Sequence, residues 1–403
     1  MPHVYSNGDC HPENFGVMMQ ANSELVWGVN DFDQTFQTPF SWDLRRGATG
    51  FALACQVRAW ANEDISMSSR RFIDGYMNVI MNSSCKVKNQ DRFIEGSNFV
   101  THNASLIGKL FAKSRDTEDP KNVLKWLEKK MSIDIVKDVF VESENVKPLP
   151  ESAIPEFQAS VDAYLYHGLA ALAKYPNDGN FYQVLSVARK LSSGTGSVGL
   201  DRYWLLIKGR YAEKNGFIIL EMKQEVNSVL EVFFRYKYSS SQEGKRAVDA
   251  MRSIYPYANL FYGWTTYRGS SFIIRERSKH SIGTDVYRIS KESLLEYASH
   301  AGRALAFSHI RARCPNFQCR IEDDSAVDTE MCENIVNYLN KYGPERFADK
   351  IHTFSIEETL RQVEAWNLLR NFVNSRLENK TFTDILRGGQ RPKVCMNLTA
   401  SLR

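Results

Sequence analysis

The sequence predicts an α+β protein with a small β-rich lobe and a large helical lobe. Residues 181–285 contain short runs of β-branched and aromatic residues separated by turn-forming glycines, which is typical of strands. On both sides of this region, apolar residues recur at helical spacing. In addition, polar clusters at the N-terminus and a glycine loop near the middle of the chain contain the residue types of nucleotide sites.

Composition places the chain among ordinary globular proteins. Its 403 residues, 43% hydrophobic and 24% charged, are enough for two or three domains or lobes. The net charge of +4 is too small to indicate nucleic acid or a membrane as a partner. The seven cysteines are odd in number and scattered, so we expect reduced thiols in a cytoplasmic protein. No apolar run approaches the ~18 residues that a bilayer span needs.

Residues 1–95 are predicted to carry polar loops and the first helices of the helical lobe. The run 25–29 is apolar and rich in β-formers, so we expect a strand that leads into Asp31. Asp43 is suited to be the N-cap of the helix that follows it, or to accept hydrogen bonds from the backbone of the N-terminal loop. A second helix is predicted over 69–81.

Residues 96–180 are predicted to form a helical insert or connecting arm. Prolines interrupt the periodicity there, and one short helix is expected over 121–131. A longer amphipathic helix is expected from Phe157 to Tyr175, where the sequence Pro-Asn-Asp-Gly gives a stop signal.

Residues 181–285 are predicted to form the β-rich, nucleotide-binding lobe. A helix is expected over 243–254. The expected strands are 186–191, 202–208, 216–223, 261–267 and 271–276.

Residues 286–403 are predicted to complete the helical lobe. Helices are expected over 291–311 and 327–342, the second closed by a Gly-Pro pair. Ser355 and Glu358 have the spacing of a capping box, so a further helix is expected to begin there.

An acidic loop at the N-terminus organises the candidate site. Asp9 is followed after four residues by Asn14, and Asp31 and Asp33 come later in the sequence Asn-Asp-Phe-Asp. This layout matches kinase-like phosphotransfer sites, in which one Asp orients the attacking hydroxyl while the Asn and a later Asp hold metal ions. We therefore predict Asp9 as the catalytic residue and Asn14, Asp31 and Asp33 as Mg²⁺ ligands. The alternative is a polar turn between two strands.

A glycine loop and a lysine form the second half of the candidate site. The G-x-G-x-x-G pattern of Gly194, Gly196 and Gly199 lies between two predicted strands, which favours a kinase-type loop over a dinucleotide-binding helix. Backbone N–H groups of this loop, together with Ser197, are expected to approach the phosphates of ATP. Lys223 ends an apolar strand and is costly to bury without an anion, which ATP would supply. The alternative is a strand-end lysine whose ammonium group reaches water.

The kinase-like parts occur in rotated order along the chain. The catalytic and metal loops come first, whereas the glycine loop, the lysine strand and a hinge strand at 272–277 come later. Residues 302–309 resemble the helix that leads into the catalytic loop of aminoglycoside phosphotransferase-like kinases. A circular permutation preserves such contacts when the joined ends lie close together. The sequence therefore predicts a circularly permuted, bilobal protein-kinase-like fold.

Seven motifs spread along the chain form a specific set. They are Gly8–Gly16, Asn30–Asp33, Pro39–Arg46, Val187–Lys190 running into Gly196–Gly199, Met222-Lys223 with Ser228, Gly263-Trp264 and Leu305–His309. As a set they resemble the DUF2252 family, a mostly bacterial group. The family is itself similar to protein-kinase-like folds, especially aminoglycoside phosphotransferases, whose Asp-x4-Asn and Ile-Asp-Phe loops match Asp9, Asn14 and Asp31. The resemblance thus implies a phosphotransferase fold without implying a substrate.

Two departures from the family pattern bear on the site. Members usually carry several tens of residues before the first motif, so this chain is expected to be either truncated or a short member. After the lysine the family usually has Glu-Ala, whereas Gln224 and Glu225 follow Lys223 here. The acidic partner of Lys223 is therefore open among Glu225, Glu231 and Glu243.

Several functions compete on this sequence. The first is transfer of the γ-phosphate of ATP, with Mg²⁺, to a hydroxyl of a small molecule or protein. The others on this fold are a nucleotide-binding pseudokinase scaffold and a nucleotidyl transferase that binds ATP in reverse. His11, in Gly-Asp-Cys-His, also fits a dinuclear metallophosphatase, but the other histidines lack the required spacing. Cys314, Cys319 and Cys332 fit structural zinc sites poorly.

Overall fold

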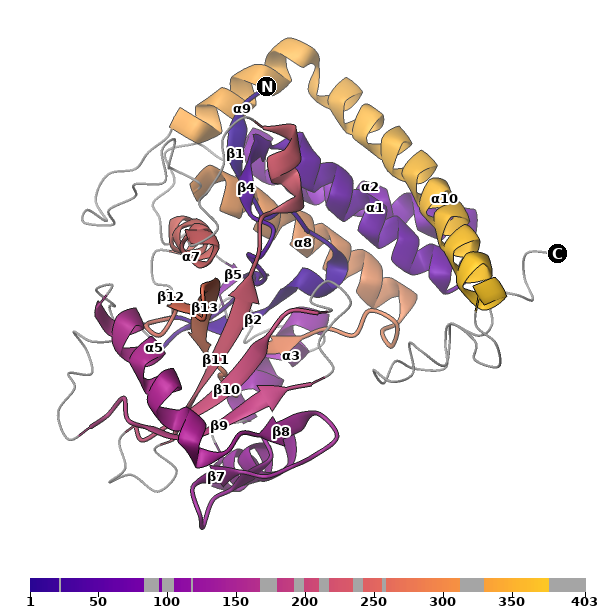
Figure 1. Cartoon of the computed structure of the whole chain (residues 1–403). Coiled ribbons are helices and arrows are strands. Elements are labelled where there is room, and N and C mark those ends of the chain that lie inside the picture. The colour runs from indigo at the N-terminus through magenta and orange to yellow at the C-terminus, as the bar shows by residue number, and fades with distance from the viewer. Residues whose placement is uncertain are drawn as a thin grey trace.

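The structure is a mixed α+β fold, as the sequence predicts. It is a computed structural model that describes residues 1–21, 23–82, 94–95, 105–116, 119–166, 180–191, 199–209, 217–234, 242–255, 259–311 and 330–376. A six-stranded sheet lies at one end of the molecule, and long helices gather at the other (Figure 1). No helix in these ranges combines the length and apolar character that a bilayer crossing requires.

The six-stranded sheet is antiparallel throughout, in the order β12-β13-β11-β10-β9-β8. The strands expected between 181 and 285 are all present, and their ends lie within two residues of the prediction. The strands are β8 (Val146–Pro148), β9 (Val184–Lys190), β10 (Arg202–Ile207), β11 (Ile218–Glu225), β12 (Gly263–Tyr267) and β13 (Ser270–Glu276).

The described part of the arm predicted at residues 96–180 is mixed rather than helical. β8 joins the six-stranded sheet and α5 packs against it, so these two elements belong with the β-rich part of the molecule. The other expected helix, over 121–131, is an α-helix continued by a π-helix. The elements are α3 (Leu106–Arg115), α4 (Pro120–Lys125), η5 (Trp126–Lys130), β6 (Ile133–Asp134), β7 (Val139–Phe140), η6 (Glu151–Ala153) and α5 (Ile154–Tyr166).

Both faces of the six-stranded sheet are covered. Leu205 and Ile207 of β10 belong to a core that includes α5 on one face. Trp204 and Leu206, at the alternate positions, pack on the other face with Phe140 of β7. This alternation is the period of two of a strand, and it explains why β10 reads as a continuous apolar run.

Two small sheets hold the N-terminal segments. β1 pairs with β4, and the order of the other sheet is β14-β2-β3-β5. The strand expected over 25–29 is confirmed as β3, and it leads directly into Asp31. The elements are β1 (His3–Ser6), η1 (Pro12–Asn14), β2 (Phe15–Met19), β3 (Leu25–Val29), β4 (Phe36–Pro39), β5 (Ile94–Glu95) and β14 (Ile282–Gly283).

The helices pack around one large core. α2 and α8 approach closely because both carry glycine at the contact: a Cβ at Gly302 would lie 1.9 Å from the carbonyl oxygen of Phe72, and one at Gly75 would lie 2.1 Å from that of Ser299. α10 runs along α1 and α2 (Figure 1). The helices are α1 (Ser41–Val57), α2 (Asn62–Asn82), α7 (Glu243–Ile254), α8 (Lys291–Arg311), α9 (Glu330–Tyr342) and α10 (Pro344–Arg376).

Three helix starts differ from the sequence prediction. α1 begins at Ser41, so Asp43 lies inside its first turn instead of capping it. α2 begins one to two turns earlier than the expected 69–81. α10 runs without a break through the expected capping box, because Ser355 donates to the carbonyl of Ile351 and thus hydrogen-bonds within the helix.

The cysteines are not all reduced thiols. Cys10 and Cys55 are free and buried, as expected, but Cys332 is disulfide-bonded. Cysteine number and spacing cannot show which sulfurs the fold brings together. Since its sulfur is already bonded, Cys332 is not a zinc ligand. The remaining cysteines, Cys85, Cys314, Cys319 and Cys395, lie outside the described residues.

Candidate functional site

The N-terminal loop that carries Asp9 is held by the buried side chain of Asp43. The backbone N–H groups of Asn7 and Gly8 donate to the two Asp43 carboxylate oxygens, at 2.6 and 2.9 Å. Gly8 has a φ of +81°, and a Cβ there would lie 2.1 Å from the carbonyl oxygen of Gln34, so the position requires glycine. Of the two roles predicted for Asp43, acceptor for the loop backbone is confirmed and N-cap is wrong.

Two further buried side chains, His309 and Tyr76, connect to Asp43 through polar contacts. Nε2 of His309, near the end of α8, lies 3.2 Å from Oδ2 of Asp43, and the hydroxyl of Tyr76 lies 2.9 Å from His309 Nδ1. All three side chains are buried. One tautomer satisfies both contacts: Nδ1 accepts from the Tyr76 hydroxyl, and Nε2–H donates to Asp43. The end of α8 is thereby fixed to the loop, although 266 positions separate His309 from Asp43.

Asp9 lies at the accessible edge of the loop. Its side chain is 42% exposed, and Oδ1 accepts hydrogen bonds from Nη2 and Nε of Arg46, at 2.8 and 3.0 Å. Nε2 of His11 is 3.7 Å from the other oxygen, Oδ2. The side-chain amide of Asn14 donates to the backbone carbonyl of Asp9 at 2.9 Å. Arg46 therefore fixes the orientation of a carboxylate that a second molecule can still reach.

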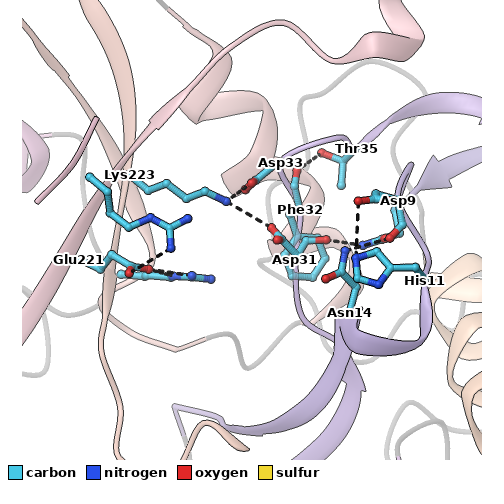
Figure 2. A network of polar contacts seen from close by, with 12 residues as sticks. Asp9, His11, Asn14, Asp31, Phe32, Asp33, Thr35, Glu221 and Lys223 are labelled. Atoms are coloured by element: carbon cyan, nitrogen blue, oxygen red, sulfur yellow. Dashed lines mark hydrogen bonds and ion pairs between the residues drawn. The ribbon is translucent and has the colours of Figure 1, made fainter. Parts of the chain in front are cut away.

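Asp31, Asp33 and Lys223 meet between the two halves of the site (Figure 2). Nζ of Lys223 makes a close ion pair with Asp33 and lies 3.7 Å from Oδ1 of Asp31. The Lys223 side chain is only 3% exposed. Such a buried ammonium group needs an anionic partner, and here the loop after β3 provides two. Figure 2 shows Asp9, His11 and Asn14 on the far side of these carboxylates from Lys223.

The sequence-based candidates for the acidic partner of Lys223 are wrong as direct contacts. Glu231 accepts from Asn227 at 2.5 Å, and Glu243 pairs with an arginine of its own helix. Glu225 is fully buried and close enough to Lys223 to interact electrostatically. Burial raises the pKa of Glu225 to about 7, against the opposing effects of Lys223 and Arg246. The candidates were chosen near Lys223 in the chain, whereas its partners come from a segment distant in sequence.

Arg246 is a site residue that the sequence analysis missed. It is fully buried on α7, and its Nε pairs with Glu243 at 2.7 Å. Its Nη atoms donate to the backbone carbonyls of Thr35, Asp33 and Val226, at 2.6, 2.8 and 3.1 Å. One guanidinium thus fixes the backbone that carries Asp33 relative to the end of β11. The sequence feature that could have pointed to Arg246 is its place among the apolar positions of the amphipathic helix α7.

A cavity of about 270 Å³ opens beside Asp31. One side is formed by the end of β13 and the residues that follow it, Arg275 to Ser278, which is where the sequence predicted a hinge strand. Glu221 of β11 pairs with Arg275 at 2.7 Å. Burial opposes the ionised form of Glu221, but Arg275, Arg277 and Arg202 outweigh it and hold its pKa well below the usual range.

The glycine loop lies almost wholly outside the described residues. This applies to Gly194, Gly196 and Ser197, which the sequence analysis predicted to bind the cofactor. Gly199 is described: its φ is +85° and a Cβ there would meet nothing within 4 Å. The strands on either side, β9 and β10, are antiparallel neighbours, as a strand–loop–strand prediction requires.

The predicted metal ligands Asn14, Asp31 and Asp33 offer only oxygen atoms, which suits Mg²⁺. Oδ1 of Asp31 and Oδ1 of Asp33 are buried and accept no hydrogen bond from any residue that the structure describes. Asn14 uses its amide nitrogen on the Asp9 carbonyl, which leaves its oxygen as a possible ligand. Within the described ranges, no three His, Cys, Asp or Glu side chains gather as a metal site. The residues therefore fit a Mg²⁺ ion that takes further oxygens from phosphates, and they do not form a closed protein cage.

His11 has a structural role in the loop. It is the N-cap of η1, and its Nδ1 accepts from the backbone N–H of Glu13 at 3.2 Å. With no cluster of three metal-binding side chains in the described part of the chain, the dinuclear metallophosphatase alternative finds no support.

Comparison with known proteins connects the chain to one family. The model of the family described as "Uncharacterized protein conserved in bacteria (DUF2252)" matches residues 1–370. This range includes both halves of the candidate site. Searches of curated proteins and of solved structures give no match.

Proposed function

This chain belongs to the DUF2252 family, and on that premise we propose that it is an ATP- and Mg²⁺-dependent phosphotransferase with a circularly permuted, bilobal protein-kinase-like fold. One observation carries the proposal: Lys223 contacts Asp33 and Asp31, although 190 positions separate Lys223 from Asp33. A lysine on a strand of the sheet and a metal-binding Asp must meet at one nucleotide in such enzymes. Had these residues lain on opposite faces of the molecule, the proposal would fail.

The contacts of α8 support the permuted order. In an unpermuted arrangement, the helix equivalent to α8 would lead into the catalytic loop. Here His309 contacts Asp43, which holds that loop, and the hydroxyl of Tyr297 donates to the carbonyls of Pro12 and Phe15, at 2.9 and 3.3 Å. Side-chain contacts therefore connect α8 to the loop in place of a peptide link.

Each site residue takes one role in the proposed reaction. Asp9 orients the acceptor hydroxyl and receives its proton as the oxygen attacks the γ-phosphorus, while the bond to the β-phosphate breaks and ADP leaves. Lys223 and the backbone of the glycine loop bind the phosphates. Asn14, Asp31 and Asp33 would hold Mg²⁺, which when bound neutralises phosphate charge. Most of the rate enhancement expected from such a site is positioning, which agrees with the rigid support of Asp9 and Asp33.

The cavity beside Asp31 is the place that we propose for the base of the nucleotide. It adjoins the residues after β13, where the hinge of a kinase-like fold would lie, and it reaches Asp31 and Phe32. From this cavity a triphosphate could extend toward Lys223, since Lys223 lies 3.7 Å from Asp31.

One observation favours a second candidate function, nucleotidyl transfer. Arg275 and Arg277 line the same cavity, and guanidinium groups are suited to phosphates. If ATP bound in reverse, its γ-phosphate would lie at these arginines, the acceptor oxygen would attack the α-phosphorus, and pyrophosphate would leave as AMP is transferred. Arg275 is already paired with Glu221, which makes this orientation the less favoured of the two.

The test compares ATP turnover and thermal stability for the natural chain, Asp9→Ala, Asp31→Ala and the control Asp162→Ala, with a small-molecule extract of bacterial cells as the source of acceptors. Asp162 is an exposed residue of α5, far in sequence from the site. We expect ATP with Mg²⁺ to raise the melting temperature of the natural chain and of Asp9→Ala. Turnover should fall about 10²- to 10⁴-fold in Asp9→Ala, the range expected when a general base is lost.

Labelled ATP separates the candidate functions. Transfer of a γ-label to an acceptor supports the phosphotransferase, and transfer of an α-label supports nucleotidyl transfer instead. Stabilisation by ATP without transfer of either label would identify a nucleotide-binding scaffold and refute both enzymes. Turnover that is unchanged in Asp31→Ala would likewise refute the assignment of the site.

A further inference from the structure

A second cavity, of about 480 Å³, lies between α1 and α10 next to the proposed catalytic loop. It is connected to Asp9 through Arg46, which lines the cavity and pairs with the Asp9 carboxylate at 2.8 Å. Its volume is in the range of small-molecule sites. One wall is the face of α1 formed by Trp42, Arg45, Thr49 and Leu53, and the opposite wall is the face of α10 formed by Phe354, Glu358 and Gln362.

Among the charged side chains that line this cavity, Arg45 differs from the others because it has no ion pair with a described residue. Its guanidinium lies over the ring of Phe354, 4.8 Å from the centroid, so it is held between the two helices. Among the residues that the structure describes, its buried Nε has no hydrogen-bond acceptor and its guanidinium has no carboxylate partner. An arginine that is fixed in place but lacks an anion is in the state expected of a binding group before its ligand arrives.

Thr49 adds a second unused polar atom on the same face of α1. It lies one helical turn after Arg45 and is 6% exposed, and its buried hydroxyl has no hydrogen-bond partner in the part of the chain that the structure describes. A buried hydroxyl without a hydrogen-bond partner loses the hydration that it has in the unfolded chain, so a ligand that bonds to it is favoured. Two unused hydrogen-bonding groups at i and i+4 therefore converge on the same space.

The other charged side chains that line the cavity already have polar partners. Glu358 pairs with Arg361 at 3.0 Å and accepts from the side chain of Gln362 at 2.7 Å. Arg46 is paired with Asp9, and the buried Asp43 carboxylate accepts from the loop backbone and from His309. Among the described residues, Arg45 is therefore the charged side chain of the lining that has neither an ion pair nor a hydrogen bond, and it is cationic.

We propose that this cavity is the acceptor site and that the acceptor is a hydroxyl-bearing organic anion. Arg45 and Thr49 hold its carboxylate or phosphate group, and its hydroxyl reaches Asp9 at the edge where Arg46 lies. The assignment rests on the proposed phosphotransferase function, because it gives a substrate class to the same site. A polycationic acceptor such as an aminoglycoside would face Arg45 without a free carboxylate to bind it, so the resemblance to aminoglycoside phosphotransferases does not extend to their substrates.

Anion binding can be measured without any catalytic assay. The probe is sulfate, titrated at constant ionic strength against chloride, with the melting temperature of the full chain as the readout. The variants are Arg45→Met and the near-isosteric Thr49→Val, and the control is Arg71→Met, which removes an exposed arginine of α2 that is not part of the cavity. We expect saturable stabilisation of the natural chain and of the control, and an increase in the apparent Kd of about tenfold or more in Arg45→Met.

The same samples separate this inference from the proposed function. Lys223→Met is included, because sulfate could also occupy a phosphate position near Lys223. Loss of the sulfate effect in Lys223→Met but not in Arg45→Met or Thr49→Val would overturn the inference, as would the absence of saturable stabilisation in the natural chain. Stabilisation by ATP with Mg²⁺ is read in parallel: if it is absent while the Arg45-dependent sulfate effect persists, the proposed function fails and the anion site stands.

The chemical class of the acceptor is tested by fractionation. A small-molecule extract of bacterial cells is separated on an anion-exchange column before it is incubated with the protein and γ-labelled ATP. We expect labelled product from the fraction retained on the column, and its formation should fall at least tenfold in Arg45→Met while stabilisation by ATP is kept. Product that arises only from the unretained neutral and cationic molecules would refute the assignment.

Discussion

The replacement Asp43→Asn tests whether Asp43 supports the loop that carries Asp9, the proposed catalytic residue. In the natural chain, one carboxylate accepts from two backbone N–H groups and faces His309 Nε2, with only 1% of the side chain exposed. An asparagine at this position keeps one oxygen and presents an NH₂ group where the other oxygen stood. That NH₂ group then faces the backbone N–H of Asn7 or Gly8, and because both are donors no hydrogen bond can form between them.

The expected cost follows from these contacts. At least one charge-assisted hydrogen bond is lost, at about 1.5–3 kcal/mol, and one buried donor is left unpaired, at about 1–3 kcal/mol. Partial relaxation of the loop offsets part of this energetic cost, so we expect the free energy of unfolding to fall by about 2–4 kcal/mol.

Two assays test this prediction, one for the stability of the whole chain and one for the protection of the loop. Urea unfolding, followed by tryptophan fluorescence, measures the loss of global stability. Hydrogen exchange of an N-terminal peptide, followed by mass spectrometry, measures protection of the loop amides, which should decrease in Asp43→Asn. The control is Asp162→Asn, because Asp162 also accepts a side-chain hydrogen bond, at 2.9 Å, but is exposed. A loss below about 0.5 kcal/mol in Asp43→Asn, equal to that of the control, would refute the inferred support.

Two further replacements test the centre of the site. Arg246→Lys should lower the free energy of unfolding by about 3–5 kcal/mol, because an ammonium group cannot replace a buried guanidinium that contacts Glu243 and three backbone carbonyls. Urea unfolding measures this change, with Arg71→Lys as the control. A change no larger than that of the control would contradict the prediction. Glu225→Gln should alter the pH dependence of stability. The pKa of Glu225 is about 7 in the folded chain and 4.5 in the unfolded chain. Its contribution to the free energy of unfolding is therefore fully present below pH 4.5 and is lost as the pH rises through 7. The free energy of unfolding of the natural chain minus that of Glu225→Gln should fall on the order of 1–3 kcal/mol between pH 5 and pH 8, and a flat difference curve would contradict the pKa assignment.

Local patterns in the sequence were sufficient for most of the secondary structure. The strands between 181 and 285 were predicted within two residues, because β10 and its neighbours are long apolar runs ended by clear turn signals. α7 was predicted with its observed ends, 243 and 254. The start of α10 was missed because Ser355 and Glu358 have capping-box spacing but use their side chains within and along the helix.

The contacts that assemble the site were only partly accessible from sequence. The spacing of Asp9, Asn14 and Asp31 suggested a chemistry, and that chemistry suggested a meeting with Lys223, which the structure shows. Spacing could not reveal that Asp33 is the nearer partner of Lys223. Nor could it show that Arg45, one residue before the partner of Asp9, has no anionic partner among the described residues, since this depends on every element that packs nearby.

On the proposed permuted fold, the hydrogen bonds that α8 makes through Tyr297 and His309 have to replace a covalent connection. Closing the chain between Tyr297 and Pro12, which are 285 positions apart, costs about 5 kcal/mol of loop-closure entropy from the logarithmic term. The hydrogen bond from Tyr297 to the Pro12 carbonyl joins neutral groups and is worth about 0.5–1.5 kcal/mol. The Asp43 carboxylate accepts from His309 and from two backbone N–H groups of the loop, and each of these bonds is worth about 1.5–3 kcal/mol. Their sum is at least as large as the entropic cost, so the proposed catalytic loop can be held in place without a peptide link to α8. The buried polar chain from Tyr76 through His309 to Asp43 is therefore explained as the feature that makes this motif order compatible with an assembled site.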